Sequence, residues 1–212
     1  MKNLVIPKNL KKKREIKIKK SYLINFEDKI KNLYETGKIR GPVHLSSGNE
    51  NFLIDIFKYI DHTDFVFSAW RNHYHAILHG IKAKILTDSI VKGKSMGIIS
   101  KKPFFYSSSI VGGIIPIALG VALGLKQKNN QASKVWCFIG DMTMETGQFY
   151  EAYKYSQNNN LPIQFVVEDN DISVHTPTKS AWGKKMKIPK NVIYYFYKNK
   201  YPHHGTGKWV NF

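Results

Sequence analysis

Polar side chains follow two apolar runs in the middle of the chain, at the points where the runs end. Asp141 comes shortly after the run at residues 135–139, and Asn170 after a second run at residues 163–167. A carboxylate and an amide oxygen are hard ligands, and Mg²⁺ is commonly held by one or two such groups together with substrate phosphates. The first turn after Asp141 is also predicted to open a helix, whose free N–H groups favour a phosphate. The two residues therefore suggest a metal-bridged diphosphate.

The elements around these residues explain how the two could meet. Residues 135–139 and 163–167 are short apolar runs rich in valine and isoleucine, and residues 145–156 between them have helical spacing. A strand–helix–strand unit is almost always a right-handed crossover, so its two strands run parallel and end at the same sheet edge. Open α/β sheets bind ligands at that edge. On spacing alone, the alternative that Asp141 and Asn170 only cap their loops stays open.

The rest of the chain fits an α/β fold, in which a parallel sheet is covered by helices on both faces. Ser47 and Glu50 have the S-x-x-E spacing of a capping box, which would start a helix. The other expected elements are strands at residues 64–70 and 191–198 and helices at residues 22–36, 71–79 and 114–126.

The composition is that of a soluble globular protein. The chain has 212 residues, of which 42% are hydrophobic and 23% charged, enough for one substantial domain. We expect a basic arm at residues 1–20 and a single domain at residues 21–212. The one cysteine, Cys137, excludes an intrachain disulfide and indicates a reducing compartment. Because residues 1–20 are rich in lysine and lack the apolar stretch of a secretory signal, we expect a cytoplasmic protein.

Two features resemble signals for a membrane or for nucleic acid. The longest uncharged apolar segment, residues 110–125, is shorter than the ~20 residues that a membrane-spanning helix needs, so we expect no membrane span. The formal net charge is +18, but the lysines are spread along the chain and only residues 11–20 form a dense block. In the absence of a nucleic-acid motif, we expect a solvated lysine-rich surface and no nucleic-acid partner.

Several segments in a fixed order resemble the alpha subunits of 2-oxo acid dehydrogenases that depend on thiamine diphosphate. Gly140-Asp141-Met142 and Asp169-Asn170 resemble the two ends of the thiamine-diphosphate motif, which are Gly-Asp-Gly and an Asn pair. The likeness extends over about residues 25–182. The other matching segments are GKIRGPVHLSSGNE at 37–50, WRNH at 70–73, GKSMG at 93–97 and SIVGGIIPIALGVALGLK at 109–126.

The resemblance implies a thiamine-diphosphate-binding fold and a ligand set for Mg²⁺. Asp141, the Asn170 side chain and the Ile172 carbonyl would hold the ion. Arg71 would contact the diphosphate, since a planar guanidinium suits phosphate oxygens.

Further residues are implied at the cofactor and at the substrate entrance. His44 and His73 match histidines that lie near the substrate entrance in the family, and would be catalytic. One departure from the family pattern is Met142, which stands where the motif has its second glycine. Four residues would contact the cofactor through the main chain, namely Met142 and Thr143 at the diphosphate and Ser109 and Val111 at the aminopyrimidine ring.

The resemblance also implies a partner. In the family, a glutamate on a beta-type subunit activates the cofactor, so this chain would act with such a subunit, as an α2β2 heterotetramer. The reaction would be decarboxylation of a 2-oxo acid and transfer of the product to an acceptor, which in the family is a lipoyl-bearing protein. Two alternatives stay open: the N-terminal half of a split transketolase, and a non-catalytic subunit that has kept the fold. His75 and His79, four apart on one expected helix, have the spacing of metal ligands, with packing as the competing interpretation.

Overall fold

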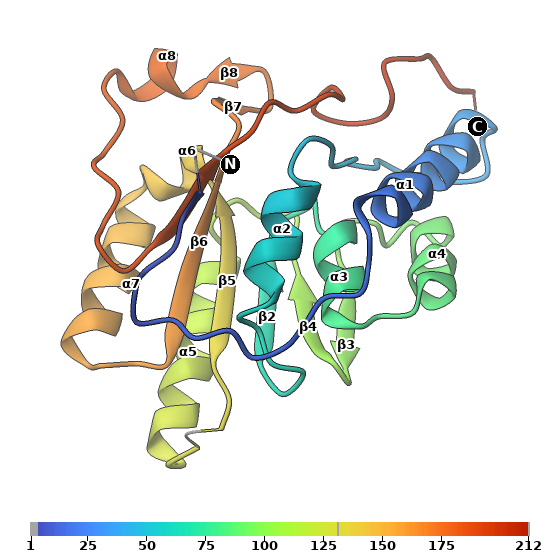
Figure 1. Cartoon of the computed structure of the whole chain (residues 1–212). Coiled ribbons are helices and arrows are strands. Elements are labelled where there is room, and N and C mark those ends of the chain that lie inside the picture. The colour runs from blue at the N-terminus through green and yellow to red at the C-terminus, as the bar shows by residue number, and fades with distance from the viewer. Residues whose placement is uncertain (1–3, 131, 212) are drawn as a thin grey trace.

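The computed structural model describes residues 4–130 and 132–211 (Figure 1). Its centre is a sheet in the order β1-β9-β6-β5-β2-β4-β3. The neighbours from β4 to β9 pair in parallel, and β1 and β3 are antiparallel edge strands. The strands of this sheet are β1 (Leu4–Val5), β2 (Phe65–Ser68), β3 (Ile99–Lys101), β4 (Phe104–Ser107), β5 (Val135–Gly140), β6 (Ile163–Asp169) and β9 (Ile193–Phe196).

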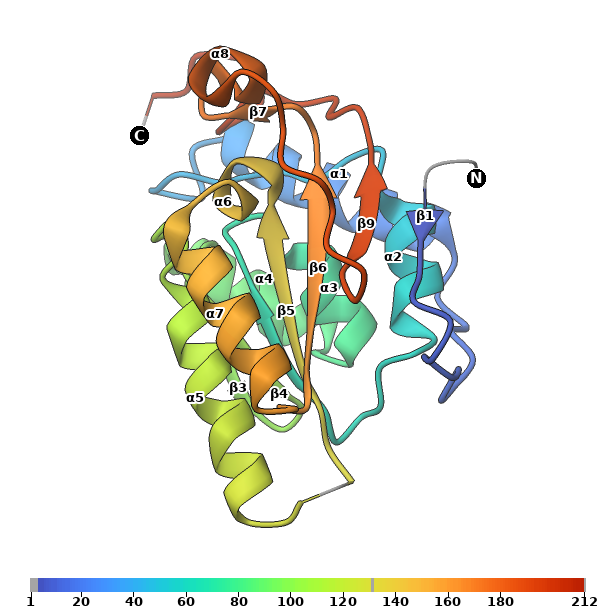
Figure 2. The ribbon, with the colours of Figure 1, turned by 90° about the vertical axis from the view of Figure 1, so that its left-hand side faces the viewer.

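Helices cover both faces of the sheet, as Figures 1 and 2 show together. One face packs against α1 (Lys20–Glu35), α2 (Glu50–Phe57), α3 (His73–His79) and α4 (Ala83–Val91). The other face packs against α5 (Ile114–Gln127) and α7 (Gly147–Asn158). At the carboxyl edge of the sheet lie α6 (Asp141–Met144), the hairpin of β7 (Ile172–Ser173) and β8 (Thr176–Pro177), and α8 (Thr178–Trp182).

The alternation of side chains along β5 explains why its sequence is a continuous apolar run. Trp136 and Phe138 point into the core beneath α1–α4, while Cys137 and Ile139 point into the core beneath α5 and α7. All four side chains are buried. A strand that is covered on both faces has no solvent side on which to place polar residues.

The loop between β4 and α5 is held close to α7 by a glycine. Gly112 has φ of +73°, and a Cβ atom at this position would lie 2.4 Å from Oε1 of Gln148. A larger residue would be strained there by the positive φ, whereas the Gln148 amide, at the end of a flexible side chain, could move aside. The Ile-Val-Gly-Gly segment therefore needs a glycine at residue 112 to bring this loop down onto the first turn of α7.

The predicted α/β class with a mainly parallel sheet is confirmed, and so are the predicted central strands and helices. The predicted capping box is wrong. The N–H of Gly48 donates to Oε1 of Glu50 at 3.0 Å, and α2 begins at Glu50 because Gly48, with φ of +91°, turns the chain before it. The division into an arm and one domain stays a prediction: residues 1–3, 131 and 212 lie outside the described residues, and β1 pairs with β9.

Candidate functional site

The topology of the sheet places a pocket between β2, β5 and β6. From β2 the chain continues to β4 on one side, whereas from β5 it continues to β6 on the other, so the strand order reverses between β2 and β5. Open α/β sheets bind ligands outside the carboxyl ends of strands at such a switch point. A pocket lies at this point, lined by residues that follow β2, β5 and β6. The fold therefore brings three separate loops to one place.

The structure brings together six of the ten residues that the sequence predicts for the site, and places the other four elsewhere. Ser109 and Val111 are exposed in the loop after β4, at the same edge of the sheet but outside the pocket lining. His44 and His73 lie behind the pocket wall. The six residues in the lining are Arg71, Asp141, Met142, Thr143, Asn170 and Ile172.

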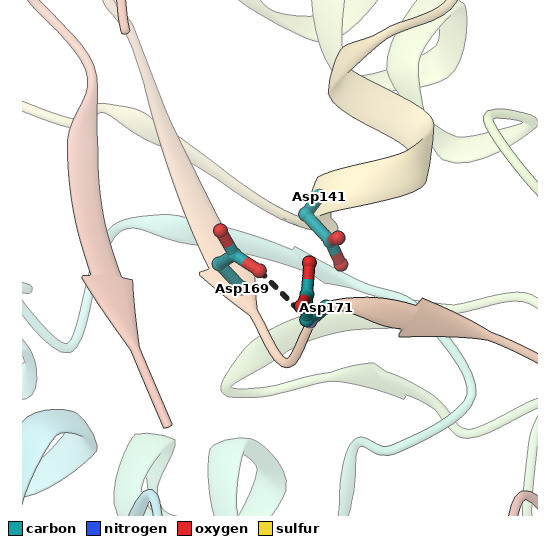
Figure 3. A group of neighbouring side chains, drawn as sticks. All are labelled: Asp141, Asp169 and Asp171. Atoms are coloured by element: carbon teal, nitrogen blue, oxygen red, sulfur yellow. Dashed lines mark hydrogen bonds between the residues drawn. The ribbon is translucent and has the colours of Figure 1, made fainter. Parts of the chain in front are cut away.

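An acidic cluster lies where β5 and β6 end. Carboxylate oxygens of Asp141, Asp169 and Asp171 lie within 4.8 Å of one another, and Figure 3 shows the three side chains converging. The N–H of Asp171 also donates to Oδ1 of Asp169 at 2.9 Å. Neither Asp169 nor Asp171 was among the predicted site residues, although both are neighbours of Asn170 in the sequence. Their acidity next to a predicted metal ligand was the signal that could have identified them.

The ammonium of Lys185 lies within this cluster. Its Nζ is 2.8 Å from both carboxylate oxygens of Asp169, 2.8 Å from Oδ1 of Asp171 and 3.5 Å from Oδ2 of Asp141. The hydroxyls of Thr178 and Tyr194 donate to Asp141 and Asp169 respectively. No sequence pattern distinguishes Lys185 from the lysines around it.

The charge balance of the cluster favours a further cation. With all three carboxylates ionised, the single ammonium leaves two negative charges uncompensated at the end of β5 and β6. Burial raises the pKa of Asp141, the hydrogen bond from Thr178 opposes this shift, and the charge of Asp169 adds to it. A divalent ion with oxygen ligands suits such a donor set, so the residues present fit Mg²⁺.

Arg71 offers a positive charge in the lining of the same pocket. Its Nη2 donates to the carbonyl oxygen of His203 at 3.3 Å. Its Nε is buried and, among the described residues, has no hydrogen-bond partner. A guanidinium N–H without a partner in a pocket wall is suited to an anionic oxygen. Arg71 thus fits the predicted contact with a diphosphate.

His44 supports the pocket wall from behind. Its Nδ1–H donates to the carbonyl oxygen of His203 at 2.6 Å, and its ring packs against that of Trp70, with the centroids 5.9 Å apart. Burial lowers the pKa of His44 to about 4. The imidazole is therefore neutral at pH 7 and holds together the segments that carry Trp70, Arg71 and His203.

His73 lies in the core beneath α1, where its side chain is completely buried. Its Nδ1 is 3.1 Å from Oε1 of Glu27, and its Nε2 is 2.9 Å from the hydroxyl of Ser95. Next to it, Asn72 donates to the carbonyl oxygens of Trp70 and Ser95. These contacts anchor the loop that carries Arg71. In the structure, His73 therefore helps to position this loop and does not line the pocket. Its predicted catalytic role stays a prediction.

The other two histidines of α3 are buried as well. Nε2 of His75 lies 3.2 Å from Oε1 of Glu168, which lines the pocket, and Nε2 of His79 lies 3.1 Å from the carbonyl oxygen of Asp64. Each histidine therefore has its own neighbour, which favours the packing interpretation of their spacing.

Met142 links α6 to α8. The indole N–H of Trp182 donates to Sδ of Met142 at 3.0 Å. The side chain that replaces the motif's second glycine thus contacts the helix above the pocket.

The fold and the pocket together define an α/β protein with a pocket at the switch point of a mainly parallel sheet, lined by carboxylate, amide and guanidinium side chains. The family model described as "Dehydrogenase E1 component" matches residues 19–195. The chain therefore belongs to the dehydrogenase E1 component family.

Curated relatives agree with this family. The chain is 34% identical over 166 residues to the alpha subunit of an acetoin:2,6-dichlorophenolindophenol oxidoreductase of Bacillus subtilis, covering 74% of this chain and 50% of the relative. It is 32% identical over 164 residues to the alpha subunit of the pyruvate dehydrogenase E1 component of Rickettsia prowazekii, covering 73% and 50%. For the corresponding subunit of Porphyra purpurea the identity is 31% over 166 residues, covering 71% and 48%. The chain thus spans about half the length of these relatives.

Within residues 4–130 and 132–211, every helix is too short or too polar to cross a membrane.

Proposed function

We propose that this chain is the alpha-type subunit of a thiamine-diphosphate-dependent 2-oxo acid dehydrogenase and binds the diphosphate of the cofactor through Mg²⁺. The observation that carries this proposal is the convergence of Arg71, Asp141 and Asn170, from three separate loops, on one pocket at the switch point of the sheet. The family match and the names of the relatives support the same reaction class.

The roles of the residues follow from their chemistry. Asp141, the amide oxygen of Asn170 and the carbonyl of Ile172 would hold Mg²⁺ through oxygen atoms. Arg71 would hold the diphosphate through charge-assisted hydrogen bonds. When bound, thiamine diphosphate supplies the electron sink for decarboxylation of the 2-oxo acid. The buried pairs that involve His44 and His73 keep the loop of Arg71 in place while the pocket is filled.

A second chain completes the proposed enzyme. We assign no residue of this chain as the glutamate that would activate the cofactor, so a beta-type subunit supplies it, in an α2β2 heterotetramer. The exposed loop with Ser109 and Val111 lies at the sheet edge where a partner would enclose the cofactor ring. The acceptor of the product is a lipoyl group on another protein, and pyruvate is the substrate that two of the relatives' names suggest.

The test uses the chain co-expressed with the beta-type chain of its own genome. Melting of the assembled complex is followed with Mg²⁺ and thiamine diphosphate together, with each alone, and with a chelator. At 100 times the dissociation constant, binding stabilises the folded state by about 2.7 kcal/mol. For a chain of this size, that corresponds to a rise of roughly 5–10 °C in the melting temperature.

Absence of this rise in the assembled complex contradicts the cofactor assignment. Where the rise is observed, turnover with pyruvate, with acetoin and with a ketose phosphate identifies the substrate class. Turnover of the ketose phosphate alone would favour a split transketolase over a dehydrogenase.

A further inference from the structure

The acidic cluster at the proposed magnesium site already contains a cation that belongs to the chain. Nζ of Lys185 is the common neighbour of all three carboxylates, at 2.8 Å from Asp169 and Asp171 and at 3.5 Å from Asp141. These distances are those of direct ion pairs. Without Lys185, the three carboxylates would lie within 4.8 Å of one another with no counter-charge among them.

Lys185 lies in an irregular connection between two regular elements. Residues 183–190, between α8 and β9, form no helix and no strand. Within this connection, the N–H of Met186 donates to the carboxylate of Glu145, so the backbone next to Lys185 is held at α6. The side chain of Lys185 is 29% exposed, and its four-carbon stem ends in a compact charge. The ammonium can therefore leave the cluster by rotation of the side chain, while the backbone contact at Met186 remains.

A divalent ion and an ammonium compete for the same oxygen atoms. Mg²⁺ held by Asp141 would place two positive charges near Lys185 Nζ, which now lies 3.5 Å from Oδ2 of that residue. Like charges at such a distance repel each other strongly in a partly buried site. A structural lysine that remained beside the ion would weaken its binding.

We propose that Lys185 is an internal counter-ion that holds the carboxylates of Asp141, Asp169 and Asp171 together in the cation-free protein and is displaced when a divalent ion binds at Asp141. This inference rests on the proposed function for the identity of the ion. It adds a counter-charge that offsets the repulsion among the three carboxylates in the cofactor-free protein, and that sets a threshold for loading, since the ion must displace the ammonium.

The first experiment measures the binding of Mn²⁺ alone to the full chain by electron paramagnetic resonance, for the wild type and three variants. In Lys185→Met the side chain keeps its length and loses its charge, and we expect Mn²⁺ to bind at least about tenfold more tightly, or ~1.4 kcal/mol. We expect Lys185→Arg, which keeps the charge, to bind like the wild type. The matched control Lys184→Met removes an exposed neighbouring lysine and is expected to change nothing. Unchanged or weaker binding of Mn²⁺ by Lys185→Met overturns the proposal.

The second experiment follows the ammonium itself in the wild-type chain, so it does not depend on the folding of a variant. The rate of acylation by an amine-specific reagent is measured at each lysine by mass spectrometry, with and without Mn²⁺. We expect the rate at Lys185 to rise when the ion binds, and the rate at Lys184 to stay constant. A rate at Lys185 that stays constant or falls at saturating Mn²⁺ also overturns the proposal.

The experiments distinguish a failure of the proposed function from a failure of the counter-ion role of Lys185. If Mn²⁺ displaces Lys185 but thiamine diphosphate adds no stability to the assembled complex, the counter-ion stands and the proposed function is wrong. If thiamine diphosphate and Mg²⁺ bind normally and Lys185→Met gains no affinity for the ion, the function stands and the counter-ion is wrong.

Discussion

Nε2 of His73 lies 2.9 Å from the hydroxyl of Ser95, in a part of the core where both side chains are completely buried. Nδ1 of the same ring faces Glu27, which is also buried. Burial raises the pKa of Glu27, while the hydrogen bond from His73 acts against this shift. The imidazole thus links α1, the start of α3 and the segment before β3 just behind the loop that carries Arg71.

Replacement of His73 by alanine is expected to destabilise the fold. It removes the partner of a buried carboxylate, and the loss of one member of a buried pair costs about 3 kcal/mol or more. The free energy of unfolding, measured by urea titration, is expected to fall by this amount. The control His175→Ala removes an exposed histidine and should leave the free energy nearly unchanged. If His73→Ala retains its stability but loses turnover in the assembled complex, His73 is catalytic after all.

Replacement of Asp141 by asparagine is expected to separate ion binding from folding. Burial already disfavours the charged carboxylate, and an amide oxygen can still accept the hydrogen bond from Thr178. We therefore expect the melting temperature without ligands to change by no more than about 2 °C, or roughly 1 kcal/mol. The rise caused by Mg²⁺ with thiamine diphosphate should disappear.

The control for this variant is Asp171→Asn, which changes an exposed carboxylate of the same cluster. It is expected to keep most of the ligand-dependent rise. A large loss of stability in Asp141→Asn without ligands would assign Asp141 a mainly structural role.

The sequence predicts the parts of the site that depend on strand ends. The sequence predicts that Asp141 and Asn170 lie close together, because each follows a buried strand and neighbouring parallel strands end at the same edge of the sheet. The sequence does not predict the pair β3 and β4, because strands of three and four residues are too short to show a periodic pattern. No periodicity marks the path of residues 183–190, so the contact of Lys185 with the acids could not be derived.

The burial of His73 cannot be predicted from the sequence, for a similar reason. Its partner Glu27 lies 46 positions away on α1, and nothing local indicates that the two helices meet. The motif identifies His73 as important, whereas only the packing shows that its ring faces away from the pocket lining.

Replacement of Arg71 by methionine is expected to weaken the binding of thiamine diphosphate. Hydrogen bonds from a charged group contribute about 1.5–3 kcal/mol, which corresponds to a loss of roughly 10- to 100-fold in affinity. Calorimetric titration of the assembled complex with thiamine diphosphate at saturating Mg²⁺ measures this loss. Arg71→Lys should recover only part of it, because an ammonium lacks the planar fork of the guanidinium.

The matched control is Arg40→Met, which removes an exposed arginine. It is expected to bind the cofactor like the wild type. Equal affinities for Arg71→Met and Arg40→Met would show that Arg71 does not touch the diphosphate.

The buried His79 is expected to make folding sensitive to mild acid. Burial, and to a lesser extent the charge of Arg14, lower the pKa of His79 to about 4. The unfolded chain protonates this histidine near its ordinary value of about 6.5. Between these two values the unfolded state binds more protons than the folded state, so stability is complete above pH 6.5 and falls as the pH is lowered toward 4. Each pKa unit of the difference corresponds to about 1.4 kcal/mol.

The measurement is the urea midpoint of the wild type and of His79→Gln between pH 7 and pH 4.5. Glutamine keeps an N–H donor for the carbonyl oxygen of Asp64 but does not titrate, so the variant should lose less stability across this range, whatever its stability at pH 7. A residual slope is expected, because His44 also has a pKa lowered to about 4. The double variant with His44→Gln should be flatter still. Identical slopes for the wild type and His79→Gln would mean that His79 takes up a proton in the folded protein as readily as in the unfolded chain.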